Sequence, residues 1–269
     1  MAEAVSVFPG LLKEWRRHRR MSQLELATSS GISQRHISFL ETGRSNPSRQ
    51  MVVALCDCLS VPLRERNALL AGAGFAPMYQ AEKLDHESLQ FFRESLATVI
   101  AHHEPYPALV LDGRWNVVLA NEAAVRFFSR FVDPATILGS EQDEFRIIRL
   151  CLENDAMRPH ITNWPTLMHA LLQRCRHALA INPKDEGLRR VIEDILSDPD
   201  APAHWQRPAT EPVRPVVDMR LEKDGEQWAL FTMLAHFGAP EHVTLQELSV
   251  ESFYPADPET RAFFERHCG

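Results

Sequence analysis

The stretch MSQLELATSSGISQRHISFLETGRSNP, residues 21–47, constrains the fold of this chain more than any other. Ser22 followed three residues later by Glu25 is the pattern of a capping box, which predicts the start of a short helix. Gly31 can adopt a positive φ at little steric cost, so the chain can turn there. Ser33 is well placed to cap a second helix. The pattern therefore predicts two short helices joined by a glycine turn.

The second of these helices carries a surface suited to reading DNA. Ile37 and Leu40 face inward on it, and polar and aromatic side chains three or four residues apart share the opposite face. Gln and Arg side chains pair bidentately with adenine and guanine edges in the major groove. We therefore predict a helix-turn-helix. The expected DNA-contacting residues are Gln23, Ser33, Gln34, Arg35, Ser38, Phe39, Arg44 and Asn46.

The same stretch resembles the Cro/repressor-type (XRE family) DNA-binding domains. The positions that carry the resemblance are Gln23, Ala27, Gly31 and Ile37. The run LETGR that starts at Leu40, followed by Asn46 and Pro47, is similar to that family's exit from the recognition helix. Further helices are predicted at residues 9–20, 48–59 and after Pro62, so residues 1–73 form a five-helix domain. An unrelated helical hairpin is the alternative.

The distribution of charge supports a nucleic-acid partner for this end of the chain. The whole protein has a net charge of −7, but residues 11–50 hold eight basic and three acidic side chains, a local charge of +5. A basic end on an acidic body is typical of one DNA-contacting module attached to a body that DNA repels. The arginines predicted on the first helix either touch phosphates or are merely solvated: Arg16, Arg17, Arg19 and Arg20.

The length and the cysteine content limit the number of domains and the cellular compartment that we expect for this protein. A chain of 269 residues suits two domains. Its five cysteines are odd in number and scattered, as expected of reduced thiols in a cytoplasm, and Cys56 and Cys58 are expected to be packing residues. No apolar run reaches the roughly 18 residues of a membrane span, and no secretory signal pattern is present. We expect a cytoplasmic protein that has no membrane partner.

Residues 74–84 lack a clear hydrophobic period and are predicted to be a linker. Residues 85–269 are predicted to form a second domain. That domain begins with a helical pattern, continues with a hairpin around Asp112 and Gly113, and ends in segments of period two. This order predicts an α+β PAS-like fold. The predicted helices are 85–102, a short one after Asn121, 141–152, 165–180 and 187–196, and the predicted strands are 108–111, 115–120, 217–222, 228–237 and 243–250.

Three segments of this second domain resemble the MmyB-like ligand-binding domain: HEPYPALVLDGRWNVVLAN, RPHITNW and FGAPEHVTLQELSVESFYPAD. That domain characteristically follows an XRE helix-turn-helix in bacterial regulators. The resemblance implies an apolar pocket for a small lipophilic molecule such as a fatty acid. This chain departs from the family where an Asn-Leu-Leu-Arg run is common, since it has FRIIR at residues 145–149.

Pocket residues are predicted on strands and helices that face the layer between sheet and helices: Leu119, Phe128, Trp164, Phe231 and Met233. Arg158 is the candidate for an anionic head group, with a surface salt bridge as its alternative role. The aromatic and methionine side chains could instead close on themselves as solid core. A mostly apolar concave site with few polar groups is what a small-molecule pocket requires.

The sequence shows no Gly-x-Ser-x-Gly elbow, P-loop or His-Glu-x-x-His zinc helix, so we predict no enzyme, no metal and no cofactor. The predicted function is a sequence-specific transcription regulator that binds an inverted-repeat operator as a homodimer and senses a small lipophilic ligand. One rival is an antitoxin-like or adaptor protein whose helix-turn-helix serves autoregulation. A second is an enzyme in the C-terminal domain.

Overall fold

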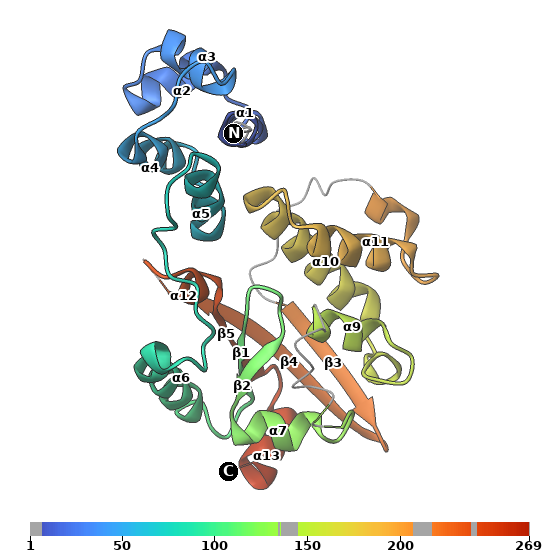
Figure 1. The fold of residues 1–269 in the computed structure, drawn as a ribbon. Coiled ribbons are helices and arrows are strands. Elements are labelled where there is room, and N and C mark those ends of the chain that lie inside the picture. The colour runs from blue at the N-terminus through green and yellow to red at the C-terminus, as the bar shows by residue number, and fades with distance from the viewer. Residues whose placement is uncertain (1–6, 134, 136–144, 207–216, 238–240, 269) are drawn as a thin grey trace. The chain divides into compact units, whose positions relative to one another are not determined.

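The computed structural model describes residues 7–133, 135, 145–206, 217–237 and 241–268. They form two compact units (Figure 1). The first unit contains the helical N-terminal region as far as Ala81, together with residues 241–246. The second begins at Glu82 and combines an antiparallel sheet with helices.

The first unit is built from five helices: α1 (Phe8–His18), α2 (Gln23–Ser30), α3 (Gln34–Glu41), α4 (Arg49–Cys58) and α5 (Leu63–Gly72). Their apolar faces meet in one core that includes Trp15, Leu26 and Ile37, all fully buried. Cys56 belongs to the same core, and burial raises the pKa of its thiol to about 12. The prediction that Cys56 is a packing residue is confirmed.

The turn between α2 and α3 forms as the sequence predicts. The Glu25 amide donates to Ser22 Oγ at 3.1 Å, and the Ser22 amide donates to a Glu25 carboxylate oxygen at 2.6 Å, which completes the capping box. Gly31 ends α2 at φ +70°, and the Ser33 side chain caps α3 by accepting from the His36 amide. Local residue preferences therefore fix the start of α2, the turn at Gly31 and the start of α3.

The second unit is organised on a five-stranded antiparallel sheet of order β2-β1-β5-β4-β3. Its strands are β1 (Ala108–Leu111), β2 (Val117–Ala120), β3 (Val217–Lys223), β4 (Glu226–His236) and β5 (Ser249–Pro255). Its described α-helices are α6 (Gln90–Ala101), α7 (Glu122–Phe128), α9 (Arg146–Leu152), α10 (Trp164–Ile181), α11 (Glu186–Ser197) and α13 (Pro258–His267). Of α12 (Val243–Glu247), residues 243–246 are assigned to the first unit, where Gln246 Oε1 accepts from the Leu63 amide at the start of α5 at 2.8 Å. A hairpin, then helices, then a β-meander make this an α+β PAS-like fold, as the sequence predicts.

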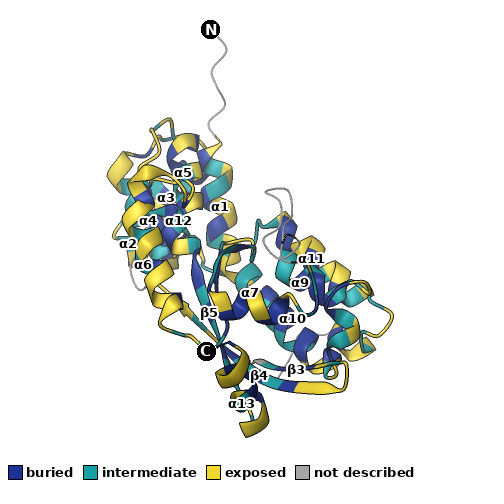
Figure 2. Cartoon of the chain, turned by 90° about the horizontal axis from the view of Figure 1, so that it is seen from below, coloured by how far each residue is buried: buried dark blue, intermediate teal, exposed yellow. Residues whose placement is uncertain are grey.

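The two faces of the sheet differ in their covering. On β4, Trp228 and Leu230 point inward to a core shared with α7, α9, α10, α11 and α13. Phe231 and Met233 point to the opposite face, where Met233 remains 53% exposed. Although the run at residues 228–237 is mostly apolar, β4 is therefore buried along one face only. Figure 2 shows the burial of each segment by colour.

On the other face, α6 packs against β1 and β2. Val110 is buried although it points away from the main core, and α6 supplies the cover with Leu96 and Ile100, which are buried as well. Leu119 pairs with Val110 in the ladder and so shares this face. The covered part of this face therefore lies over the β1–β2 hairpin.

The strand predicted at residues 243–250 is wrong in its position. Residues 243–247 form the single-turn helix α12, and the strand begins only at Ser249. Val243 and Leu245 alternate as in a strand, but the tertiary contacts of these residues override that local preference. The true strand was obscured because Ser249 and Glu251, both polar, occupy its buried positions.

No helix within the described residues is both long and apolar enough to cross a membrane.

Candidate nucleic-acid interface and ligand-binding domain

Helix α3 presents the predicted readout residues on one side. Gln34 and Arg35, at its first turn, are exposed, and Ser38 and Phe39 are half-buried one turn later. The Arg35 guanidinium lies 5.4 Å from the centroid of the Phe39 ring, a cation–π contact within the helix. This contact restricts the rotamers of Arg35. This face of α3 therefore presents the Arg35 guanidinium, a bidentate donor, beside the side-chain amide of Gln34.

The other predicted DNA-contacting residues flank this helix. Arg44 and Asn46 are exposed in the turn that follows α3. The Arg44 amide donates to the Phe39 carbonyl at 2.9 Å, which holds the start of the turn against the helix. Ser33 is exposed at the opposite end, where its hydroxyl accepts from the His36 amide.

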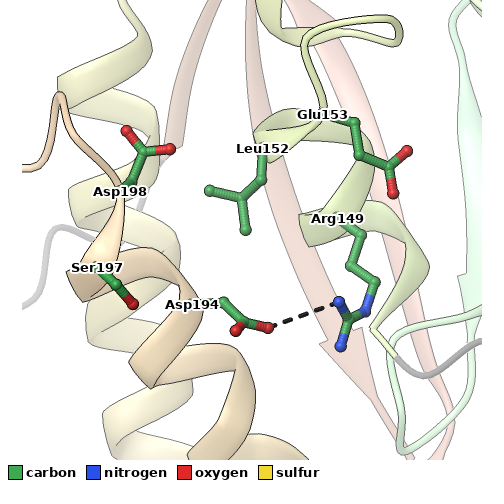
Figure 3. Close-up of a pocket in the computed structure, with 6 residues that line it drawn as sticks. All are labelled: Arg149, Leu152, Glu153, Asp194, Ser197 and Asp198. Carbon is green, nitrogen blue, oxygen red and sulfur yellow. Dashed lines mark ion pairs between the residues drawn. The ribbon is translucent and has the colours of Figure 1, made fainter.

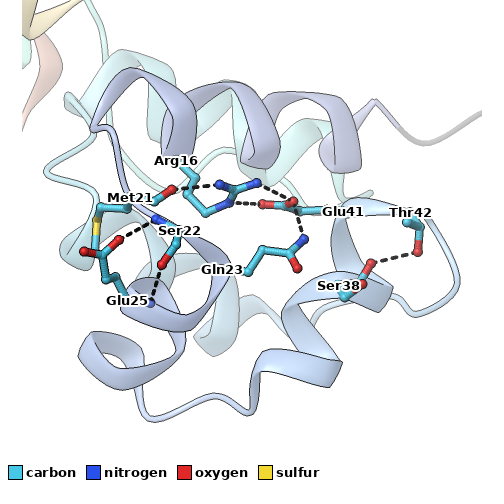
Figure 4. A network of polar contacts seen from close by, with 8 residues as sticks. All are labelled: Arg16, Met21, Ser22, Gln23, Glu25, Ser38, Glu41 and Thr42. Carbon is cyan, nitrogen blue, oxygen red and sulfur yellow. Dashed lines mark hydrogen bonds and ion pairs between the residues drawn. The ribbon is translucent and has the colours of Figure 1, made fainter.

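A buried ion-pair network fixes α1, α2 and α3 to one another (Figure 4). The Glu41 carboxylate, whose side chain is 2% exposed, accepts from Arg16 Nε at 2.6 Å and Arg16 Nη2 at 2.9 Å. Gln23 Nε2 donates to the same carboxylate at 2.8 Å, and Arg16 Nη1 donates to the Met21 carbonyl at 2.7 Å. Burial opposes ionisation of Glu41, but the hydrogen bonds from Arg16 and Gln23 outweigh it and lower the pKa of the carboxyl.

Two of the four arginines considered for phosphate contact have structural partners instead. Arg16 is held by Glu41, and Arg19 donates to the carbonyls of Leu59 and Ser60 at 2.8 and 3.0 Å at the end of α4. For these two the phosphate interpretation is wrong, because their donors satisfy a buried carboxylate and helix-end carbonyls. Arg17 and Arg20 are exposed. Gln23 also holds Glu41, which the sequence pattern alone did not indicate.

The predicted pocket residues do not share one layer. Phe128 and Trp164 are buried on the inner side of the sheet, whereas Leu119, Phe231 and Met233 lie on the opposite face. Phe231 stacks on Tyr254 there, with ring centroids 5.2 Å apart. The prediction that all five face one layer between sheet and helices is therefore wrong. Phe231 and Met233 pair with Tyr254 and Ser252 on the face away from the main core, and Leu119 pairs with Val110 on the part of that face that α6 covers.

Arg158 and Trp164 do come together. The guanidinium of Arg158 lies 4.0 Å from the ring centroid of Trp164, and it donates to Asp198 at 2.6 and 2.9 Å and to Asp200 at 2.6 Å. These hydrogen bonds raise the pKa of Arg158. Trp164 in turn donates to the Cys151 carbonyl at 2.8 Å. Arg158 thus has the salt-bridge role that was the alternative to binding a head group.

A shallow depression of about 290 Å³ lies between the ends of α9 and α11 (Figure 3). Its lining is largely charged: Arg149, Leu152, Glu153, Asp194, Ser197 and Asp198. Arg149 and Asp194 form an ion pair across it at 3.5 Å. None of the six predicted ligand residues lines this depression, and its polarity does not suit a lipophilic molecule.

Sequence reasoning missed a polar cluster on the inner face of the sheet. Arg174 on α10 lies 3.2 Å from the Glu251 carboxylate and 3.4 Å from Thr232 Oγ1. Both partners are buried. The period of SVESFYP would have indicated that Glu251 points inward, had the strand been placed at residues 249–255. Within the described ranges, no three His, Cys, Asp or Glu side chains gather as a metal site requires.

A helix-turn-helix with an exposed Gln–Arg face, followed by a PAS-like unit, defines a class: DNA-binding transcription regulators with a ligand-binding domain. Family comparison agrees, because residues 12–66 match the helix-turn-helix model and residues 92–266 match the model "MmyB-like transcription regulator ligand binding domain". The chain belongs to this MmyB-like family, behind an XRE-type helix-turn-helix.

Solved structures with some similarity include the PAS domain of Bordetella pertussis BvgS, which is 14% identical. The match covers 66% of this chain and 96% of that one, with a TM-score of 0.31. An RNA-binding light-oxygen-voltage receptor is 13% identical over 97% of this chain and 62% of that chain, with a TM-score of 0.24. No curated protein matches the chain.

Proposed function

We propose that this regulator binds an inverted-repeat operator in double-stranded DNA as a homodimer, with α3 in the major groove and Arg35 reading a base. The observation that carries the proposal is the exposed first turn of α3, where Gln34 and Arg35 stand side by side and Phe39 orients the guanidinium. Arg–guanine and Gln–adenine pairs are common direct contacts in that groove. Arg44 and Asn46 then serve as backbone contacts that set the register.

Dimerisation follows from the small reach of one recognition helix. A single helix reads only a few base pairs, so helix-turn-helix proteins pair across half-sites about 10 base pairs, one helical turn, apart. Footprinting tests this directly. Two protected half-sites with two-fold symmetry are the expected result, and one isolated half-site contradicts the dimer.

The test of the readout assignment compares two arginines. The preferred duplex is selected from a random pool, and binding to it and to random DNA is measured by fluorescence anisotropy at several salt concentrations. Arg35→Ala should weaken binding to the selected duplex by about 1–3 kcal/mol and leave random binding nearly unchanged. Arg44→Ala should weaken both and reduce the salt slope by about one.

Arg93→Ala, on the exposed side of α6, removes the same charge far along the chain from α3 and is the matched control. It should leave both affinities unchanged. Equal loss of selected and random binding in Arg35→Ala refutes the assignment of Arg35 to a base.

For the second unit, we propose a small lipophilic ligand of fatty-acid type, bound on the inner side of the sheet among the buried aromatic residues. Arg158 is already held by two carboxylates, so Arg174 is the better partner for an anionic head group. Its contacts to Glu251 and Thr232, at 3.2 and 3.4 Å, are long for charge-assisted hydrogen bonds and so are readily exchanged.

Native mass spectrometry of the purified protein should detect a co-purified lipid. Dodecanoate, titrated into the DNA-binding assay, should change operator affinity, and dodecanol serves as the uncharged control. The double variant Arg174→Leu/Glu251→Gln avoids leaving a buried carboxylate unpaired, and it should weaken dodecanoate binding while leaving dodecanol binding intact. Equal effects on both compounds refute the role of Arg174.

A further inference from the structure

Phe39 on α3 is a large apolar residue that the core of its own unit does not use. Its neighbours Ile37 and Leu40 are fully buried in that core, and the partly buried residues that pack against the core lie outside α3. Among the described residues, Phe39 is half-buried and belongs to neither group. The exposed part of its ring is therefore available to whatever this face of the helix meets.

The Phe39 ring lies beside the guanidinium of Arg35. The two residues are four positions apart and share one face of the helix, and the guanidinium carbon lies 5.4 Å from the ring centroid. Within the described part of the chain, this guanidinium has no hydrogen-bonded or ion-paired partner, unlike those of Arg16 and Arg19. A phenyl ring accepts no conventional hydrogen bond, so the planar fork of donors stays free for a base while the ring restricts its position.

In a major groove, Arg35 and Phe39 would contact different base pairs. A guanidinium that binds guanine uses both O6 and N7, and so it fills the groove edge of that base pair. Successive base pairs lie about 3.4 Å apart along the helix axis. A ring centroid held 5.4 Å from the guanidinium carbon is more than one such step away and less than two, which places the ring at the neighbouring base pair.

Only one group on the edge of that neighbouring base pair suits a phenyl ring, the methyl group at C5 of a pyrimidine. The other groups exposed there are nitrogen and oxygen donors or acceptors, which a ring would remove from water without giving them a hydrogen bond. Thymine carries the C5-methyl group, and 5-methylcytosine carries it in the same position. Uracil and cytosine lack it.

We propose that Phe39 reads the C5-methyl group of a pyrimidine in the base pair beside the guanine bound by Arg35. Each half-site then contains a guanine next to a thymine, and 5-methylcytosine can replace that thymine. The contact between Arg35 and Phe39 sets the distance between two adjacent base contacts. The inference rests on the function proposed above, because it requires α3 to lie in the major groove.

The test changes single atoms or groups of the DNA and leaves the protein intact. In the selected duplex, each guanine is replaced in turn by 7-deazaguanine, which lacks the N7 acceptor, and each thymine by deoxyuridine, which lacks the methyl group. The guanine bound by Arg35 is the one at which 7-deazaguanine weakens the wild type but not Arg35→Ala. Deoxyuridine beside it should weaken wild-type binding about fourfold per half-site, the effect of exposing one buried methyl group.

A second pair of duplexes separates the two sources of the methyl group. The thymine–adenine pair beside the guanine is replaced by cytosine–guanine or by 5-methylcytosine–guanine, so that only the methyl group differs. The methylated duplex should bind about fourfold more tightly per half-site. Equal binding of these two duplexes overturns the proposal.

Phe39→Ala should abolish the preference for thymine over deoxyuridine, and this ratio is independent of any general loss of affinity. Phe75→Ala is the matched control, because Phe75 is also half-buried, lies outside α3 and meets the Arg49 guanidinium at 5.6 Å. It should keep the fourfold preference. A preference that persists in Phe39→Ala, or that appears only at thymines away from the guanine, overturns the proposal.

Failure of the proposed function gives a different result. If 7-deazaguanine has no effect that depends on Arg35, then Arg35 reads no guanine and the function proposed for α3 fails together with this inference. If that effect is present and deoxyuridine beside the guanine binds as well as thymine, Arg35 reads the base and only the role of Phe39 is overturned.

Discussion

Replacement of Glu41 tests whether the buried ion pair, rather than the apolar core alone, holds the DNA-binding unit together. The carboxylate accepts three hydrogen bonds at 2.6–2.9 Å, two of them from Arg16, whose side chain is only 11% exposed. Glu41→Ala removes all three and leaves the guanidinium with the Met21 carbonyl as the remaining partner in this network. An uncompensated buried charge is the dominant cost of this substitution.

The expected loss is about 3–5 kcal/mol for Glu41→Ala, the range for removing one partner of a buried pair. Glu41→Gln retains the shape and one acceptor, so about 2 kcal/mol is expected. The double variant Arg16→Met/Glu41→Leu has no buried charge, and it should be less destabilised than Glu41→Ala although it lacks the same hydrogen bonds.

Amide exchange in α1 and α3 is the suitable assay, because a chain of two units need not unfold in one step. A factor of ten in protection corresponds to about 1.4 kcal/mol, so Glu41→Ala should reduce the protection of core amides in this unit by at least about 100-fold. The amides of β4 and β5 serve as an internal control. A loss below about fivefold in α1 and α3 refutes the reasoning.

The pH dependence supplies a second check with a definite sign. The pKa of Glu41 in the folded protein is lowered from its ordinary value of 4.5. The stability that the ionised carboxylate contributes is therefore fully present above pH 4.5, and it is lost as the pH falls through the lowered pKa. The stability difference between the wild type and Glu41→Gln should be constant from pH 6 to 8 and should close in acid.

Three further outcomes are expected. Arg19→Ala should destabilise the end of α4 by about 1–2 kcal/mol, seen as faster amide exchange there, and should leave the salt slope of DNA binding unchanged, because its donors serve two carbonyls. Arg17→Ala should lower that slope by about one if the exposed guanidinium contacts a phosphate; an unchanged slope identifies it as solvated. Gly31→Ala should cost about 1–2 kcal/mol in thermal unfolding of this unit, because the site has φ +70° although the space around it is open.

The helix-turn-helix could be predicted from sequence because its signals are local. A capping box, a glycine at positive φ and a second cap each lie within three or four residues of the backbone groups they satisfy. The roles of Arg16 and Gln23 could not be predicted in this way. Both depend on Glu41, 25 and 18 positions away, and nothing nearby in the sequence shows that Glu41 is buried.

The sequence predicted the order of helices and strands in the ligand-binding unit, but not on which face of the sheet each strand residue lies. Alternation along β4 assigns residues to two sides without revealing which side the helices cover, so Phe231 and Met233 were given the wrong face. The β5 strand carries polar residues at buried positions, one of which pairs with Arg174, and the apolar pattern therefore pointed to α12 instead. Long-range polar pairing, which has no local signature, accounts for the second error.

The position of Gln246 also has a consequence for the order of synthesis. A ribosome makes α1 to α5 first, and N-terminal domains commonly fold while the rest of the chain is still being made. Here the amide of Leu63 meets its acceptor only after β4 and most of α12 have been added. A nascent or prematurely terminated chain therefore has a helix-turn-helix whose fifth helix lacks its cap, and the first unit is completed only when most of the ligand-binding unit has been made.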